Sequence, residues 1–214
     1  MKSKCRGTKI SKKSVYIDPS VTIGNNVIIH DNVTIKGFSR IEDGAEIFSG
    51  TEITESIVGS NTKVKSSFIE FSEIGENNII GPFARIRKGT KTGQEVCIGS
   101  FVEVKNSFIQ DFTKASHLCY IGDSTIGKRV NIGCGVVFCN YNGKAKQHSI
   151  VEDDVFIGGN CNIIAPVTIQ KGAYICAGTT ITKDVSADDF VIGRVRQEHK
   201  PNLAVKYLDK KNKA

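Results

Sequence analysis

The stretch VTIGNNVIIHDNVTIKG, residues 21–37, contains a motif of six residues that repeats without a slip. Its isoleucines Ile23, Ile29 and Ile35 lie six residues apart, and a valine stands two residues before each of them. The same step continues outward from this stretch, back to Ile17 and forward to Ile53. It returns near the other end of the chain at Ile157, Ile163, Ile169, Ile175 and Ile181.

A period of six predicts one short strand and one corner in each repeat. Side chains alternate along a strand, so Val21 and Ile23 point to one face and Thr22 points to the other. The next residues, Gly24 to Asn26, are turn formers that tolerate positive φ angles. Three such units are expected to close one triangular coil. Hexapeptide repeats are typical of parallel β-helices, in which stacked coils share a core.

An ordinary β-sandwich does not fit this spacing, because its strands usually recur every 8–12 residues. Periodicity does not determine handedness, but proteins with this hexad resemble left-handed β-helices, an exception to the right-handed crossover rule. We therefore predict an all-β fold. It is a left-handed parallel β-helix of triangular coils, with projecting loops and an irregular C-terminal tail.

Composition limits the classes of protein. The 214 residues suit one elongated domain, or two at most, and the chain has neither a membrane-spanning apolar run nor a secretory signal. An odd number of cysteines without a CxxC pair argues against a disulfide framework or zinc knuckle and predicts a reducing cytoplasm. The cysteines are Cys5, Cys97, Cys119, Cys134, Cys139, Cys161 and Cys176.

The net charge of +7 is concentrated at the ends of the chain. A solvated basic tail and small anionic ligands such as phosphates explain such a charge. Because aromatic residues do not alternate with the basic ones, we expect no nucleic-acid partner. Because the chain has no membrane-spanning apolar run, we expect no membrane partner. We divide the chain into a basic segment 1–14, N-terminal coils 15–68, a main β-helix region 69–186 and a C-terminal segment 187–214.

The six-residue pattern is interrupted at three places. The first, from Val58 to Phe71, is interpreted as a corner bulge. The second follows Val104 and lasts until Ile126. The third, CNYNGKAKQHS at residues 139–149, is too polar for a narrow coil and is expected to project outward. Loops held by a rigid scaffold are frequent sites of binding and catalysis, so these interruptions are where a site is expected.

His117 lies in the second interruption, one coil after Glu103, and is a candidate general base. The alternative is a histidine that makes a hydrogen bond at a corner. The other three histidines are less suggestive: His30 is on a regular coil, His148 is in the projecting segment and His199 is in the tail.

A series of motifs follows in order along the chain: GPFARIRKGT (81–90), FVEVKNSFI (101–109), KASHLCYIGDSTIG (114–127), VNIGCGVVFCNYNGKAK (130–146), VFIGGNCNIIAPVTI (155–169) and AGTTITKDV (177–185). Together they resemble the acetyltransferase half of the bifunctional N-acetylglucosamine-1-phosphate uridyltransferase/glucosamine-1-phosphate acetyltransferase family. The resemblance is specific from about Ile69 to Tyr207. The coils from Val15 to Ile57 resemble the family only as generic hexads.

The resemblance implies a set of site residues. His117 stands where the family has its catalytic base, and Glu103 stands where a carboxylate orients that imidazole. Asn140 and Tyr141 match positions beside the attacking amine and the acetyl thioester. The residues that match the amino-sugar phosphate site are Arg87, Lys105, Tyr120, Asn131 and Lys146. Those that match the acetyl-CoA site are Cys134, Tyr141, Gly159 and Ala177, with Arg194 and Lys200 near the CoA phosphates.

The implied activity is acetyl-CoA-dependent N-acetylation of an amino-sugar phosphate. Glucosamine 1-phosphate would give N-acetylglucosamine 1-phosphate, and no metal is needed. The family is trimeric, with sites between subunits and a C-terminal segment that crosses over. Two departures stand out: Gly159 replaces a common serine, and NYNG replaces the usual NYDG. No segment resembles the Gly-rich start of a uridyltransferase domain, so nucleotide-sugar synthesis by this chain is not expected.

Three alternatives remain open from the sequence. The acceptor could be another amino sugar, including a nucleotide-linked or antibiotic one. The protein could instead be a non-catalytic β-helix scaffold. A trimeric carbonic anhydrase of the same fold would need three convergent histidines, which the spacing of the four histidines disfavours.

Overall fold

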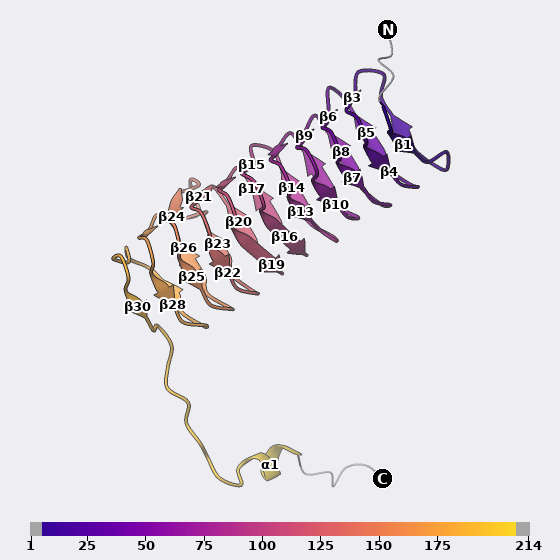
Figure 1. Ribbon diagram of the computed structural model, residues 1–214. Helices are drawn as coiled ribbons and strands as arrows, with labels where there is room; N and C mark the ends of the chain where they lie inside the picture. Colours follow the sequence, from indigo (N-terminus) through magenta and orange to yellow (C-terminus); the bar gives the residue numbers. More distant parts are fainter. Residues whose placement is uncertain (1–5, 209–214) are drawn as a thin grey trace, which may run out of the picture.

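The computed structural model describes residues 6–208, so Cys5, the rest of residues 1–5 and residues 209–214 of the C-terminal segment lie outside it. The described chain contains thirty short strands and one helix, α1 (Ala204–Leu208). Figure 1 shows the strands stacked into a rod, with the C-terminal segment leaving the last coil. No helix within residues 6–208 is long and apolar enough to cross a bilayer.

The strands form three parallel sheets, which we name A, B and C. Sheet A contains β1 (Lys9–Ile10), β4 (Ile28–Ile29), β7 (Glu46–Ile47), β10 (Lys63–Val64), β13 (Ile79–Ile80), β16 (Cys97–Ser100), β19 (Lys114–His117), β22 (Asn131–Ile132), β25 (Phe156–Ile157), β28 (Tyr174–Ile175) and β30 (Phe190–Val191). Sheet B contains β2 (Tyr16–Ile17), β5 (Thr34–Lys36), β8 (Glu52–Thr54), β11 (Phe68–Glu70), β14 (Arg85–Arg87), β17 (Glu103–Lys105), β20 (Tyr120–Gly122), β23 (Val137–Cys139), β26 (Asn162–Ile164) and β29 (Thr180–Ile181). Sheet C contains β3 (Thr22–Ile23), β6 (Arg40–Ile41), β9 (Ile57–Val58), β12 (Glu73–Ile74), β15 (Lys91–Thr92), β18 (Phe108–Ile109), β21 (Ser124–Ile126), β24 (Ser149–Val151) and β27 (Thr168–Ile169).

Successive strands enter the three sheets in turn, so three strands make one coil. The register places each inward side chain on its counterpart one coil away, as in Ile29 with Ile47 and Ile35 with Ile53. These side chains are at most 1% exposed. Each contributes about 1.5–3 kcal/mol by leaving water. The predicted left-handed parallel β-helix is confirmed.

The first two interruptions of the sequence pattern are shortened corners, not irregular segments. From Val64 to Ile69, and from Val104 to Ile109, the next inward residue follows after five positions. The interpretation of residues 58–71 as a bulge is wrong, since a bulge adds a residue and these corners lack one. The second interruption, after Val104, consists of regular strands joined by corners. His117 belongs to the regular strand β19.

The third interruption is a true excursion, as predicted. The inward residues Phe138 and Val151 are thirteen positions apart, and the extra residues form a loop between β23 and β24. We call residues 140–148 the projecting loop. Its tip is exposed from Tyr141 to Lys146.

The strand ladder runs through the boundary placed between residues 68 and 69, because β11 spans both. At the C-terminal end, β30 still pairs with β28, so the β-helix continues to Val191. From Ile192 to Leu208, the last residue that the structure describes, the chain has no strand and contains only the short helix α1.

Candidate active site

Three neighbouring strands of sheet B, β14, β17 and β20, direct polar side chains away from the core. The middle residue of each strand is buried, so its two neighbours point outward. The register sets Arg87 beside Lys105 and Glu103 beside Tyr120. Four of the predicted site residues therefore share one outer face over three adjacent coils.

Arg87 lies at the centre of an ion-pair network on this face. Its NH1 donates a hydrogen bond to Glu103 Oε1 at 2.7 Å, and its Nε lies 3.9 Å from Glu70 Oε1. This hydrogen bond to Glu103 is the main reason that the pKa of Arg87 is raised. About a third of the Arg87 side chain remains exposed, at 34%. A planar guanidinium in this setting is suited to bidentate contact with a phosphate.

The projecting loop brings a second lysine to the same face. Its base is closed by a hydrogen bond from Gln147 N to Asn140 O at 2.7 Å, and Tyr141 and Lys146 form an antiparallel bridge. Lys146 lies close to Lys105 and lowers its pKa. The largest cause is a hydrogen bond with Lys146, which favours the neutral amine of Lys105; burial and the like charge of Lys146 act in the same direction. Two lysines in such proximity favour an anion between them, because an anion relieves their repulsion.

Tyr120 and Asn140 meet over a glycine. Asn140 Nδ2 lies 3.5 Å from the Tyr120 hydroxyl. A Cβ atom on Gly122 would lie 2.6 Å from both the Tyr120 hydroxyl and Asn140 Nδ2. Gly122 therefore leaves the space in which these two polar groups sit. Sequence reasoning missed Gly122, although it occupies the strand position at which β14 and β17 carry Arg87 and Lys105.

His117 ends strand β19 at the corner between sheets A and B, where it pairs with Ser100. Its side chain is exposed and has no hydrogen-bond partner within residues 6–208. Glu103 is engaged by Arg87, so the structure does not bring it to His117. The orienting role of Glu103 remains a prediction.

The predicted cofactor residues lie along the corner that holds His117. Cys134, Gly159 and Ala177 occupy this corner in the three coils that follow, and backbone hydrogen bonds of 2.7–2.9 Å join neighbouring coils there. Cys134 is exposed, and a Cβ on Gly159 would approach only Cys134 O, at 3.1 Å. Small residues thus leave the edge of the β-helix open for an extended ligand.

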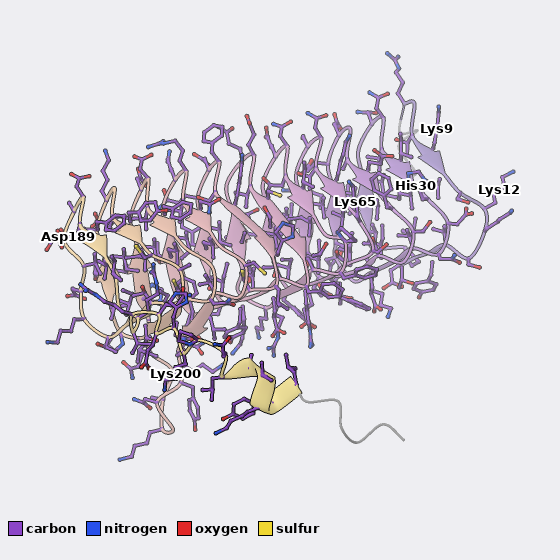
Figure 2. All side chains as sticks on the ribbon, turned by 90° about the horizontal axis from the view of Figure 1, so that it is seen from below. Lys9, Lys12, His30, Lys65, Asp189 and Lys200 are labelled. Atoms are coloured by element: carbon purple, nitrogen blue, oxygen red, sulfur yellow. The ribbon has the colours of Figure 1, made fainter. Side chains whose placement is uncertain are left out.

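Two predicted CoA-phosphate residues follow this corner. Arg194 NH1 donates to Ala177 O at 3.0 Å, which holds the guanidinium at the end of the corner column. Lys200 lies in the segment that leaves the β-helix, with its ammonium 3.6 Å from the Glu198 carboxylate. Figure 2 shows Lys200 outside the stacked coils, near α1. Arg194 is thus brought to the predicted cofactor residues and Lys200 is not.

Asn131 is separated from the rest of the predicted acceptor site. It lies in β22 of sheet A, between Lys114 and Phe156 in the register. The residues Arg87, Lys105 and Tyr120 are on sheet B. Asn131 therefore points from a different face of the same chain.

The other histidines have local partners. His30 Nε2 lies 2.9 Å from Glu46 Oε1, and its ring stacks on Phe48 at 4.8 Å between centroids. Figure 2 shows His30 in the N-terminal part of the rod. His148 Nε2 lies 3.0 Å from Thr125 Oγ1. Within residues 6–208, no three His, Cys, Asp or Glu side chains are grouped so that they could hold a metal ion.

Comparison with known proteins gives the family. A family profile described as bacterial transferase hexapeptide (six repeats) matches residues 148–183. The Bifunctional protein GlmU of Clostridioides difficile (strain 630) is 47% identical over 205 residues, which is 96% of this chain and 44% of that protein. The chain is a hexapeptide-repeat acyltransferase.

Further matches agree with this membership. The Bifunctional protein GlmU of Thermodesulfovibrio yellowstonii is 49% identical over 186 residues, or 86% of this chain and 41% of that protein. This acyltransferase chain thus spans less than half the length of the curated relatives that it matches. Because the match to the Clostridioides protein covers 96% of the chain, it includes most of the N-terminal coils. The alignment therefore extends beyond the region from Ile69 to Tyr207 in which the motifs are specific.

A solved structure shares the fold of this acyltransferase. The UDP-N-acetylglucosamine O-acyltransferase (LpxA) from Moraxella catarrhalis aligns with a TM-score of 0.53 and 21% identity. The alignment covers 74% of this chain and 68% of that chain. At this identity the likeness concerns the fold alone.

Proposed function

We propose that the protein transfers the acetyl group of acetyl-CoA to the amine of an amino-sugar phosphate. The acceptor is glucosamine 1-phosphate and the product is N-acetylglucosamine 1-phosphate. The observation that carries the proposal is the gathering of Arg87, Lys105 and Lys146 on one face of sheet B, beside Tyr120 and Asn140. Three cations next to uncharged hydrogen-bonding groups suit a sugar that carries a phosphate.

The chemistry begins with removal of a proton from the sugar ammonium. A neutral histidine titrates in the range needed for this step, and His117 is exposed and has no competing partner among the described residues. Glu103 would orient the imidazole in the loaded site. The amine then attacks the thioester carbonyl, and the tetrahedral oxyanion collapses as the carbon–sulfur bond breaks. The remaining extra proton on the nitrogen passes to the departing sulfur, so the amide forms and CoA leaves as its thiol. Backbone N–H groups in the corners IGCG (132–135) and IGGN (157–160) would stabilise the oxyanion.

A site shared by two copies of the chain would reunite residues that one chain separates. Asn131 lies on sheet A, whereas Arg87 and Lys105 lie on sheet B. The segment after Val191 also leaves the β-helix with apolar side chains exposed, including Val195 at 94% and Tyr207 at 81%. We therefore include a homotrimer in the proposal, with sites between neighbouring copies and the C-terminal segment of one copy against the next.

Acetyl-CoA is the proposed cosubstrate, and metal ions have no role in the proposed transfer. We also propose a cytoplasmic location, since the cysteines within residues 6–208 are all free thiols. Metal independence is tested by adding a chelator during turnover, which should leave the rate unchanged.

The decisive experiment is an acceptor screen. The protein is mixed with acetyl-CoA and glucosamine 1-phosphate, glucosamine, glucosamine 6-phosphate or a nucleotide-linked glucosamine, and free thiol is measured. The highest kcat/KM is expected with glucosamine 1-phosphate. A higher value with another amino sugar would reassign the acceptor. Thiol release with none of them would favour a non-catalytic scaffold.

A further inference from the structure

Asp123 is a buried carboxylate between strands β20 and β21. Its residue is 8% exposed and its backbone has a φ of 48°. Two side-chain amides donate to it: Asn106 Nδ2 to Oδ1 at 2.6 Å, and Asn140 Nδ2 to Oδ2. A buried carboxylate that receives donors on both oxygens is held in one orientation.

The backbone of Asp123 connects the coil to the projecting loop. Its N–H donates to Lys105 O at 3.0 Å, and its carbonyl accepts from Ser149 N at 3.3 Å. Its side chain holds Asn140 at the start of the loop, while its carbonyl holds Ser149 just after the loop ends. One residue thus ties both ends of the loop to the strand that carries Lys105.

The carboxylate also decides which way the Asn140 amide faces. An ionised carboxylate can only accept hydrogen bonds, so Nδ2 of Asn140 must point toward Asp123. The same nitrogen lies 3.5 Å from the Tyr120 hydroxyl. No donor among the described residues reaches Asn140 Oδ1. Among the described side-chain atoms only Ser149 Oγ is both fully buried and unpartnered, so Oδ1 of Asn140 keeps some contact with solvent, although the residue as a whole is 6% exposed.

We propose that Asp123 is a positioning residue for the acceptor amine: it turns the Asn140 amide so that Oδ1 faces the amine, and it fixes the projecting loop that carries Lys146. This inference rests on the proposed function. The unpartnered amide oxygen accepts an N–H of the acceptor, which leaves the nitrogen lone pair free to point toward the thioester. The charge of Asp123 also offsets the repulsion between Lys105 and Lys146.

The test begins with Asp123→Asn. The backbone accepts asparagine at positive φ, since Asn106 has a φ of 46° in the preceding coil. The asparagine at position 123 can accept from only one of the two amides with its single oxygen. The other amide then faces an NH2 group, or Asn140 rotates so that its own NH2 group points outward. The expected result is a fall in kcat/KM for the amine acceptor of roughly 10- to 100-fold, with an unchanged KM for acetyl-CoA.

The exchanged pair Asp123→Asn/Asn140→Asp separates orientation from mere packing. In this pair Asn106 can donate to the amide oxygen placed at position 123, and the NH2 group at position 123 faces the carboxylate placed at position 140. That carboxylate keeps an acceptor oxygen for the amine. At least tenfold of the lost kcat/KM should return. Asp154→Asn is the matched control, because Asp154 also has positive φ, 62°, but bonds Arg129 and does not touch the loop.

A second readout does not depend on activity. Hydrogen–deuterium exchange of residues 140–148 should rise in Asp123→Asn, fall back in the exchanged pair and stay at the wild-type level in the control. Unchanged kinetics and exchange in Asp123→Asn would overturn the inference, as would a loss that the exchanged pair does not recover. A wild-type protein that acetylates no amine would refute the proposed function, while the exchange data would still decide whether Asp123 anchors the loop.

Discussion

The carboxylate of Glu103 is held by Arg87, with 2.7 Å between Oε1 and NH1, and makes no hydrogen bond to His117. A phosphate that binds Arg87 competes for the same guanidinium hydrogens. Substrate binding would therefore release Glu103 at the time when an imidazolium forms on His117. This relationship connects the proposed anion site with the proposed base.

His117→Ala should lower kcat by about 10²–10⁴-fold, because the protonated amine then loses its general base. The fold should remain, since the imidazole is exposed and makes no hydrogen bond in the described structure. Steady-state kinetics and circular dichroism measure the two effects. Near-wild-type turnover in a folded variant would exclude His117 as the base.

The affinity for the sugar phosphate should fall as pH rises, and the fall should begin at a lower pH than that at which an ordinary lysine loses its proton. The pKa of Lys105 is lowered, chiefly by Lys146, so Lys105 loses its charge earlier than a free lysine would. Isothermal titration with glucosamine 1-phosphate over an alkaline pH series measures the decline. In Lys146→Met the pKa of Lys105 returns toward its usual value, so binding should be weaker overall and its decline should move to higher pH. An unshifted decline would contradict the pairing of these two lysines.

Gly122→Ala should reduce kcat/KM for the acceptor, because the added methyl group would displace the Tyr120 hydroxyl and Asn140 Nδ2. The expected loss is about tenfold or more, from a displacement at the reacting centre. Gly24→Ala is the control. A Cβ on Gly24 would lie 2.3 Å from Asp43 Oδ1, in coils far from the proposed site. This variant should therefore lower the melting temperature without changing kcat/KM. Equal kinetics in both variants would argue against a role for Gly122 in the site.

Thiol labelling should report on the corner between sheets A and B. Cys134 is exposed there, whereas burial raises the pKa of Cys119 and of Cys161. A raised thiol pKa keeps the unreactive thiol form as pH increases, so these two should label slowly at neutral pH. Acetyl-CoA should protect Cys134, as measured by mass spectrometry of labelled peptides. Labelling of Cys134 that ignores saturating acetyl-CoA would place the cofactor elsewhere.

Much of the fold followed from the sequence. The step from Ile17 to Ile53 determined which side chains face inward, because alternation along a strand and a turn of Gly and Asn leave few other choices. The polar stretch CNYNGKAKQHS, residues 139–149, identified the projecting loop, since a narrow coil has no room for so many polar residues.

Shortened corners could not be recognised from periodicity. A corner can lose one residue and keep its inward side chain stacked when another residue adopts positive φ, as Ser66, Asn106 and Asp123 do. A sequence pattern shows the same lost register whether the chain leaves the coil or turns more tightly. For this reason His117 was assigned to an interruption of the pattern and is found in the regular strand β19.

The sequence by itself determined that the chain coils and where its one long loop leaves the coil, because both depend on residues that are neighbours in the chain. Only the tertiary structure decided that Glu103 bonds Arg87, that Asn131 faces away from Lys105, and that Asp123 holds both ends of the loop. These relationships join residues one or more coils apart. They depend on the length of every intervening corner and on which of several neighbouring partners each polar side chain reaches.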